Sequence, residues 1–317
     1  MPHHQNPRPQ RSGSGRPRPP ARPGGPHPSA AARRWRAAGP ALALAALATC
    51  ALTGCQGSGS SAAAAGTGRT TAPAPGHASA SPGAPAASAS GGASKPLAGR
   101  VVAVDPGHNP HNHQHTAEIN KQVKVGNGSK ECDTTGTSTD SGYSEADFNL
   151  DVAHRLRALL TAQGAKVVLT YDGDRPWGPC VTERAEAGNR AKADVALSIH
   201  ADGAPVGRRG FHVILPGRVD EGGADNAKIV APSRRLGTDL RDAFQRVTGS
   251  ARSNYIGRGT GLDTRTDLGG LNLSTVPKVF IECGNMRDPK DAALLTSAKW
   301  RQKAAQGITE GIDRYLE

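Results

Sequence analysis

Val-Val-Ala-Val-Asp-Pro-Gly-His, residues 101–108, has the pattern of a short buried strand that runs into a loop. The first four residues are apolar, and the Asp-Pro-Gly sequence after them is typical of a turn. A strand that is apolar at consecutive positions is buried on both faces, as the strands of parallel sheets are. We therefore expect the folded part of the chain to be built around such a sheet.

Strand and helix patterns alternate through the rest of the chain. Apolar runs predict further strands over residues 166–170, 195–200, 211–215 and 278–282. Apolar residues at helical spacing predict helices after Ser144, over 182–192, and within 236–247 and 305–316. This order predicts the α/β class, with a single domain and a mainly parallel, twisted sheet flanked by helices on both faces. Chemistry in such sheets gathers beyond the C-terminal ends of the strands.

The first third of the chain differs from the rest in composition. Residues 1–98 hold ten Lys or Arg and no Asp or Glu, so most of the formal net charge of +12 lies there. Because the remainder is nearly neutral, the basic balance does not indicate a nucleic-acid partner. We predict a disordered leader with a signal peptide over 1–54, a flexible Ala/Ser/Gly/Pro linker over 55–97, and a catalytic domain over 98–317.

The signal region ends in Leu52-Thr53-Gly54-Cys55, after a basic segment and an apolar stretch too short to span a membrane. This ending resembles a bacterial lipobox, in which the cysteine is lipidated and becomes the new N-terminus. The resemblance implies an exported lipoprotein on the outer face of the cell membrane, anchored through Cys55 and acting in the cell wall. The alternative is an ordinary secretory signal that contains an unrelated cysteine.

Four polar residues are expected to meet at the C-terminal ends of the predicted strands. His108, His200 and Glu282 follow or close strands, and Glu145 begins the first helix. Two histidines and one glutamate are typical of an open zinc site, and a second, uncoordinated glutamate is a common general base. These residues are far apart in the sequence, so each could instead be an ordinary structural residue.

The same runs carry a family resemblance. Val-Asp-Pro-Gly-His at 104–108, Ser144-Glu145 before a leucine-rich helix, Ser-Ile-His-Ala-Asp at 198–202 and Ile-Glu-Cys-Gly-Asn-Met at 281–286 resemble the Amidase_3 type of zinc-dependent N-acetylmuramoyl-L-alanine amidases. The resemblance covers about residues 99–317. It is greatest to the actinobacterial form that lacks a separate wall-binding domain.

The resemblance implies a function and a set of roles. One Zn²⁺ ion would be held by His108, Glu145 and His200, and Glu282 would be the catalytic carboxylate. The reaction would be hydrolysis of the amide bond between N-acetylmuramic acid and L-alanine in peptidoglycan. The stretch over 108–140 is histidine-rich and polar, whereas many members of the family have a glycine-rich loop there.

Two other functions remain open at this point. One is a lipoprotein that binds muropeptides without cutting them, and the other is a different zinc hydrolase of the cell wall, such as a peptidase or a deacetylase. We expect a monomer whose partners are peptidoglycan or muropeptides and the membrane. Arg265 is a candidate for binding a carboxylate of the stem peptide, and a solvated loop is the alternative there.

The cysteines outside the signal region are expected to differ in role. Cys132 and Cys180 lie in predicted loops, and an exported protein meets oxidising conditions, so we expect them to form a disulfide rather than two free thiols. Cys283 adjoins Glu282 in a strand, so its side chain should point into the core on the opposite face.

Some polar neighbours of the candidate site could also take part in it. Asp105 or Asp202 could fix the ring nitrogens of the histidine ligands, although both also suit turns. The residues His111, His113 and His115 are possible rival ligands, but a solvated loop is the simpler interpretation. His212 lies within a predicted strand and is expected to be structural.

Overall fold

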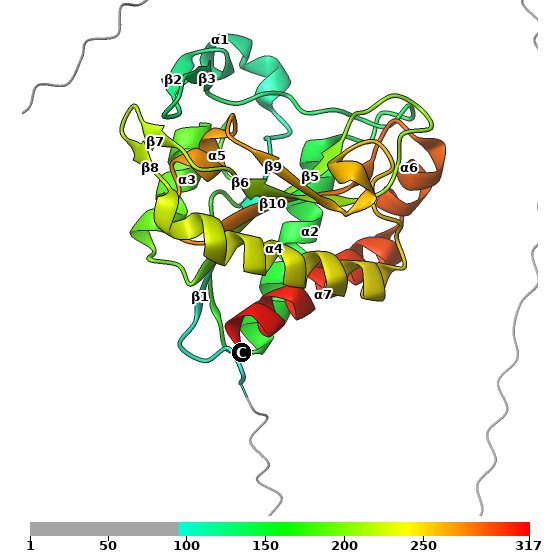
Figure 1. Ribbon diagram of the computed structural model, residues 1–317. Coiled ribbons are helices and arrows are strands. Elements are labelled where there is room, and N and C mark those ends of the chain that lie inside the picture. The colour runs from blue at the N-terminus through cyan, green and yellow to red at the C-terminus, as the bar shows by residue number, and fades with distance from the viewer. Residues whose placement is uncertain (1–94) are drawn as a thin grey trace, which may run out of the picture. The chain divides into compact units, whose positions relative to one another are not determined.

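Six strands form the central sheet of the part of the chain that the computed structural model describes, residues 95–317 (Figure 1). They are β1 (Val101–Pro106), β4 (Lys166–Leu169), β5 (Val195–Asp202), β6 (His212–Pro216), β9 (Leu262–Arg265) and β10 (Lys278–Asn285). Their order in the sheet is β4-β1-β5-β10-β6-β9. Every neighbouring pair is parallel except β10 and β6, which are antiparallel.

Helices cover both faces of this sheet (Figure 1). One face packs against α2 (Glu145–Ala162), α4 (Ala227–Thr248) and α7 (Ala298–Leu316). The other face lies against α3 (Val181–Arg190), which contacts the short α5 (Gly269–Asn272). The helix α6 (Pro289–Leu295) follows β10.

Short helices and strands lie in the segments that connect the main elements. They are η1 (Asn112–Gln114), α1 (Thr116–Ile119), β2 (Gln122–Lys124), β3 (Ser129–Glu131), β7 (Asp220–Glu221), β8 (Ala224–Asp225) and η2 (Gly257–Gly259). β2 and β3 form one antiparallel hairpin, and β7 and β8 form another.

Alternation along the strands gives the sheet two different faces. In β5, Leu197 and Ile199 belong to the large apolar core with Phe148 of α2 and Leu240 of α4. Ser198 lies between them on the opposite face. Among the described residues, the opposite face has a small apolar cluster of Ala103, Ala193, Ala196 and Val276.

The predicted α/β class and mainly parallel sheet are confirmed. The hydroxyl of Ser144 caps α2 by accepting from the backbone N–H of Asp147 at 3.1 Å. Leu97, the residue before the predicted start of the domain, is buried in the core, and its N–H donates to the carbonyl of Gln163. The predicted leader, the signal peptide with Cys55, and the linker up to residue 94 lie outside the described residues.

Within residues 95–317, no helix has both the length and the apolar character needed to cross a membrane.

Candidate metal centre and active site

His108, Glu145 and His200 come together at the C-terminal edge of the sheet. His108 follows β1, Glu145 is the first residue of α2, and His200 lies in β5. One donor atom from each lies within 4.8 Å of the others. Oε1 of Glu145 is 3.3 Å from Nε2 of His108 and 3.0 Å from Nδ1 of His200.

The backbone around these residues leaves little free space. His108 has a positive φ of 60°, which turns the chain sharply after β1. A Cβ on Gly107 would collide with the ring of His200, and one on Gly136 would lie 2.8 Å from Oε2 of Glu145. Glycine at these two positions therefore allows the main chain to approach the cluster closely.

Hydrogen bonds fix the carboxylate of Glu145. Its Oε2 accepts from the backbone N–H of Thr137 at 3.0 Å, and its Oε1 accepts from the N–H of Ala201 at 3.2 Å. The pKa of Glu145 is held well below its usual value, because His108 and His200 outweigh the opposing effect of burial. This residue is therefore an anion that faces both rings.

The outward nitrogen of each ring is also occupied. Nδ1 of His108 lies 3.0 Å from the carbonyl oxygen of Thr134, to which it can donate. Nε2 of His200 lies 3.2 Å from Oγ of Ser198, and that hydroxyl donates to Oδ2 of Asp105 at 2.8 Å. Since the serine proton goes to Asp105, the serine oxygen accepts from Nε2–H of His200. Nε2 of His108 and Nδ1 of His200, the nitrogens that face Glu145, are then the ones left to bind a metal ion.

This donor set fits zinc. Two nitrogens and one carboxylate oxygen are a common open zinc ligand set, and ligands 2.0–2.1 Å from a tetrahedral ion lie about 3.3 Å apart. The two distances from Glu145 to the rings are close to that spacing. Among the described residues, His111, His113 and His115 do not belong to this cluster.

The expectation for Asp105 and Asp202 is only partly met. Asp105 reaches His200 through Ser198 and does not bond to the ring itself. Asp202 is not a ring partner, because its Oδ2 accepts from the hydroxyl of Tyr255 at 2.7 Å. The residue next to the outward nitrogen of His108 is Asp133, 3.6 Å away, which the sequence analysis did not single out.

Glu282 lies in β10, beside the candidate metal ligands. It pairs in register with His200 of β5 on one side and with His212 of β6 on the other. Its Oε2 is buried and has no hydrogen-bond partner among the described residues. Burial, with Glu145 and Asp202 nearby, raises the pKa of Glu282 well above its usual value. Such a carboxyl group is suited to taking up and releasing a proton.

A cleft of about 380 Å³ opens at this edge of the sheet. Its lining includes the three candidate ligands, Glu282 and Arg265. Arg265, at the end of β9, makes a two-pronged ion pair with Asp267, at 2.8 and 2.6 Å. It therefore lies in the cleft as expected, with its guanidinium paired to a neighbour on the same loop.

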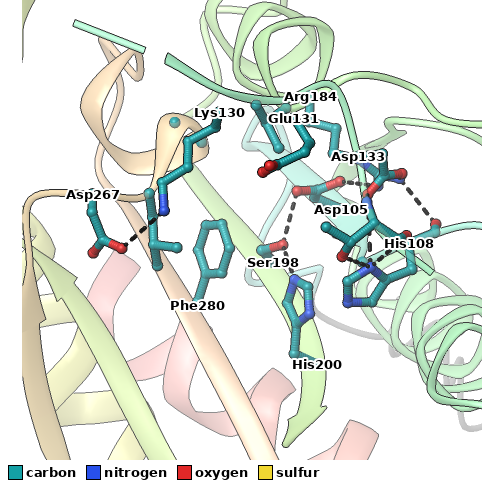
Figure 2. A pocket seen from close by; sticks show the side chains of 16 residues that line it. Asp105, His108, Lys130, Glu131, Asp133, Arg184, Ser198, His200, Asp267 and Phe280 are labelled. Atoms are coloured by element: carbon teal, nitrogen blue, oxygen red, sulfur yellow. Dashed lines mark hydrogen bonds and ion pairs between the residues drawn. The ribbon is translucent and has the colours of Figure 1, made fainter. Parts of the chain in front are cut away.

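A second pocket adjoins the histidines on the side of the β2–β3 hairpin (Figure 2). Phe280 stacks on His200 there, with ring centroids 5.2 Å apart. Lys130 lies at its edge, where its Nζ is 3.3 Å from Asp267. In Figure 2 the chain of contacts from His200 through Ser198 to Asp105 forms the wall opposite Lys130.

The remaining candidates fall outside the cluster. Cys132 and Cys180 are joined as a disulfide, and Cys283 is buried in the core on the face away from Glu282. His212 is buried beside Tyr255, and burial lowers its pKa to about 4. The histidine-rich stretch after His108 forms η1 and α1 and continues into the β2–β3 hairpin.

Comparisons with known proteins find matches over most of the described residues. The family model Amidase_3, described as N-acetylmuramoyl-L-alanine amidase, matches residues 102–314. The chain is 42% identical over 221 residues to the N-acetylmuramoyl-L-alanine amidase Rv3717 of Mycobacterium tuberculosis, covering 69% of this chain and 88% of that protein.

Two crystal structures are also similar. The N-acetylmuramyl-L-alanine amidase Ami1 from Mycobacterium smegmatis gives a TM-score of 0.64 at 42% identity, covering 69% of this chain and 98% of that one. The apo form of Ami1 from Mycobacterium abscessus gives 0.63 at 41% identity, covering 70% and 100%.

Proposed function

Because the chain belongs to the Amidase_3 family of N-acetylmuramoyl-L-alanine amidases, we propose that it hydrolyses the amide bond between N-acetylmuramic acid and L-alanine in cell-wall peptidoglycan. Family membership confirms the resemblance drawn from the sequence. We propose that one Zn²⁺ ion is held by His108, Glu145 and His200. The observation that carries this proposal is the convergence of these three donors and Glu282 in one cleft.

The residues divide the chemical work between them. When bound, Zn²⁺ supplies a Lewis acid that polarises the amide carbonyl and acidifies water. Glu282 accepts the proton of the attacking water on its carboxylate and then delivers it to the amine of the departing L-alanine. Arg265 is positioned at the cleft to bind a carboxylate of the stem peptide.

Digestion of purified peptidoglycan by the purified chain tests the reaction. We expect free stem peptides that begin with L-alanine and intact glycan strands, identified by mass spectrometry. A chelator should stop the digestion and added Zn²⁺ should restore it. Released amino acids would instead indicate a peptidase, released acetate a deacetylase, and an undigested but bound wall a muropeptide-binding protein.

We also propose that the chain is an exported lipoprotein anchored through Cys55, on the sequence pattern alone. Cys55 lies outside the described residues. Replacement of Cys55 by Ala should move the protein from the membrane fraction to the soluble fraction or the medium. Equal membrane association of both forms would remove the lipid anchor from the proposal.

A monomer is sufficient for this function. The candidate ligands and Glu282 all come from one chain, so the site is complete without a second copy. Sedimentation of the purified chain should give the mass of a single copy. A dimer that dissociates without loss of activity would also be compatible with the site.

A further inference from the structure

Arg184 is a buried arginine behind the metal centre. It is the fourth residue of α3, and only 4% of it is exposed. Its five N–H groups each have an acceptor at 2.6–2.9 Å, and these acceptors are carbonyl oxygens of Pro179, Pro106 and His108 and carboxylate oxygens of Asp105 and Asp133. A guanidinium has five such groups, so all of its donors are used.

One of the two carboxylates leads to His108. Oδ2 of Asp133 accepts from Arg184 at 2.9 Å, and Oδ1 accepts from the backbone N–H of Thr134 at 2.8 Å. Oδ1 also lies 3.6 Å from Nδ1 of His108, the nitrogen that faces away from Glu145. Arg184 additionally binds the carbonyl oxygen of His108. The guanidinium therefore holds both the main chain of this ligand and the groups around its ring.

The other carboxylate leads to His200. Oδ1 of Asp105 accepts from Arg184 at 2.8 Å, and Oδ2 accepts from the hydroxyl of Ser198 at 2.8 Å. Ser198 in turn accepts from Nε2 of His200 at 3.2 Å. Figure 2 shows Arg184, Asp105 and Ser198 lined up toward the two histidines.

The covalent structure reinforces the same arrangement. Asp133 directly follows Cys132, and Cys180 directly precedes α3, so the disulfide ties the loop of Asp133 to the helix of Arg184. The backbone N–H of Val181 also donates to the carbonyl of Cys132 at 2.7 Å.

We propose that Arg184 is a positioning residue that sets the zinc affinity, an inference that rests on the proposed function for the identity of the metal. It holds two carboxylates. Asp105 orients His200 through the hydroxyl of Ser198, and Asp133 orients His108 through Thr134, whose N–H it accepts from and whose carbonyl oxygen faces Nδ1 of the ring. Groups that orient ligands in this way commonly change metal affinity 10- to 100-fold when they are removed. Lysine cannot replace arginine here, because one ammonium cannot bridge two carboxylates in a planar fork.

The test measures the zinc dissociation constant of the full chain by competition with a chromogenic chelator. Arg184→Lys should weaken zinc binding about 100-fold, and Asp133→Asn and Ser198→Ala about 10-fold each. Combining Arg184→Lys with the other two substitutions should weaken zinc binding little further. The reason is that Asp133 and Ser198 lie on the two hydrogen-bonded chains that connect Arg184 to the histidines.

Arg301→Lys is the matched control. This arginine of α7 is also largely buried and paired with a carboxylate, that of Asp151, but it lies on the apolar side of the sheet. Urea unfolding of the chelator-treated proteins is measured in parallel. We expect Arg301→Lys to lower stability without changing the zinc dissociation constant.

Two outcomes overturn the proposal. One is an Arg184→Lys protein that binds zinc within threefold of the wild type. The other is weakened binding in both arginine variants in proportion to their loss of stability. If Arg184→Lys does not fold, unchanged zinc binding by both Asp133→Asn and Ser198→Ala overturns it equally. A wild type that binds zinc tightly but leaves peptidoglycan intact would refute the proposed function and leave the role of Arg184 standing.

Discussion

The two faces of the central sheet are formed by the same strands but serve different ends. On β10, Ile281 and Cys283 point into the apolar core, whereas Phe280 and Glu282 point to the cleft. On β5, Ile199 belongs to the core, and the residue after it is a candidate zinc ligand. Stability and chemistry are thus assigned to alternate residues of one strand.

The roles of neighbouring residues on one strand can therefore be measured separately. The apolar face is held by burial, which is insensitive to pH and to metal. The polar face is held by charged hydrogen bonds, which depend on both. Substitutions on the two faces should therefore affect different measurements, even when they are one residue apart.

The largest expected effect is that of Glu282→Gln. Loss of the proton-transferring carboxylate should lower kcat on peptidoglycan about 1,000-fold, while the bound zinc remains near one ion per chain. Product release after digestion and metal content by atomic emission check the two parts. Retention of more than a tenth of the activity would remove Glu282 from its proposed role.

Ile281→Ala tests the opposite face one residue away. Ile281 is fully buried, so the change should lower the free energy of unfolding by about 3 kcal/mol. Urea titration measures the loss. At a temperature where the variant is folded, its KM and zinc content should equal those of the wild type. A changed zinc affinity would show that the faces are coupled.

The third prediction concerns acid. Arg184 and His108 outweigh burial and lower the pKa of Asp133 to about 2. This contribution to stability is complete above the unfolded pKa of about 4 and is lost as the pH falls through about 2. It amounts to about 2 kcal/mol.

Comparison with Asp133→Asn isolates this contribution. In chelator-treated protein, the stability difference between wild type and variant should narrow steadily from pH 5 to pH 2, as followed by urea unfolding. A difference that stays constant over this range would count against an ionised Asp133 in the folded state.

The smallest effect is expected for Arg265→Met. Arg265 is partly exposed and already paired with Asp267, so its loss should raise KM for muropeptides about fivefold, with kcat changed less than twofold. Steady-state kinetics on a soluble muropeptide give both constants. An unchanged KM would place Arg265 outside the substrate contacts.

Much of the fold was predictable because its central strands are continuous apolar runs. The strand β9 was missed, since Leu262–Arg265 has one strongly apolar residue and lies at the sheet edge. The antiparallel direction of β6 was not predicted, because apolar periodicity carries no information about direction.

The candidate ligands were predictable because each lies at the end of a strand or the start of a helix. Ser198 could have been found as well, since alternation places it on the same face as His200. Arg184 could not, because a charged residue in the middle of an amphipathic helix usually faces solvent. Only the fold brings it against Asp105 and Asp133.

The burial of Leu97 has a geometric consequence. The N–H of Leu97 donates to the carbonyl of Gln163, just after α2, and the guanidinium of Arg100 donates to the carbonyl of Leu316. The segment before β1 and the end of α7 therefore lie at the same end of the domain. The candidate metal centre lies at the other end of β1, about 20 Å away for a strand of this length. A bead or support coupled just ahead of Lys95 would consequently be attached on the side opposite the cleft. The cleft would then face outward and stay accessible to an insoluble polymer.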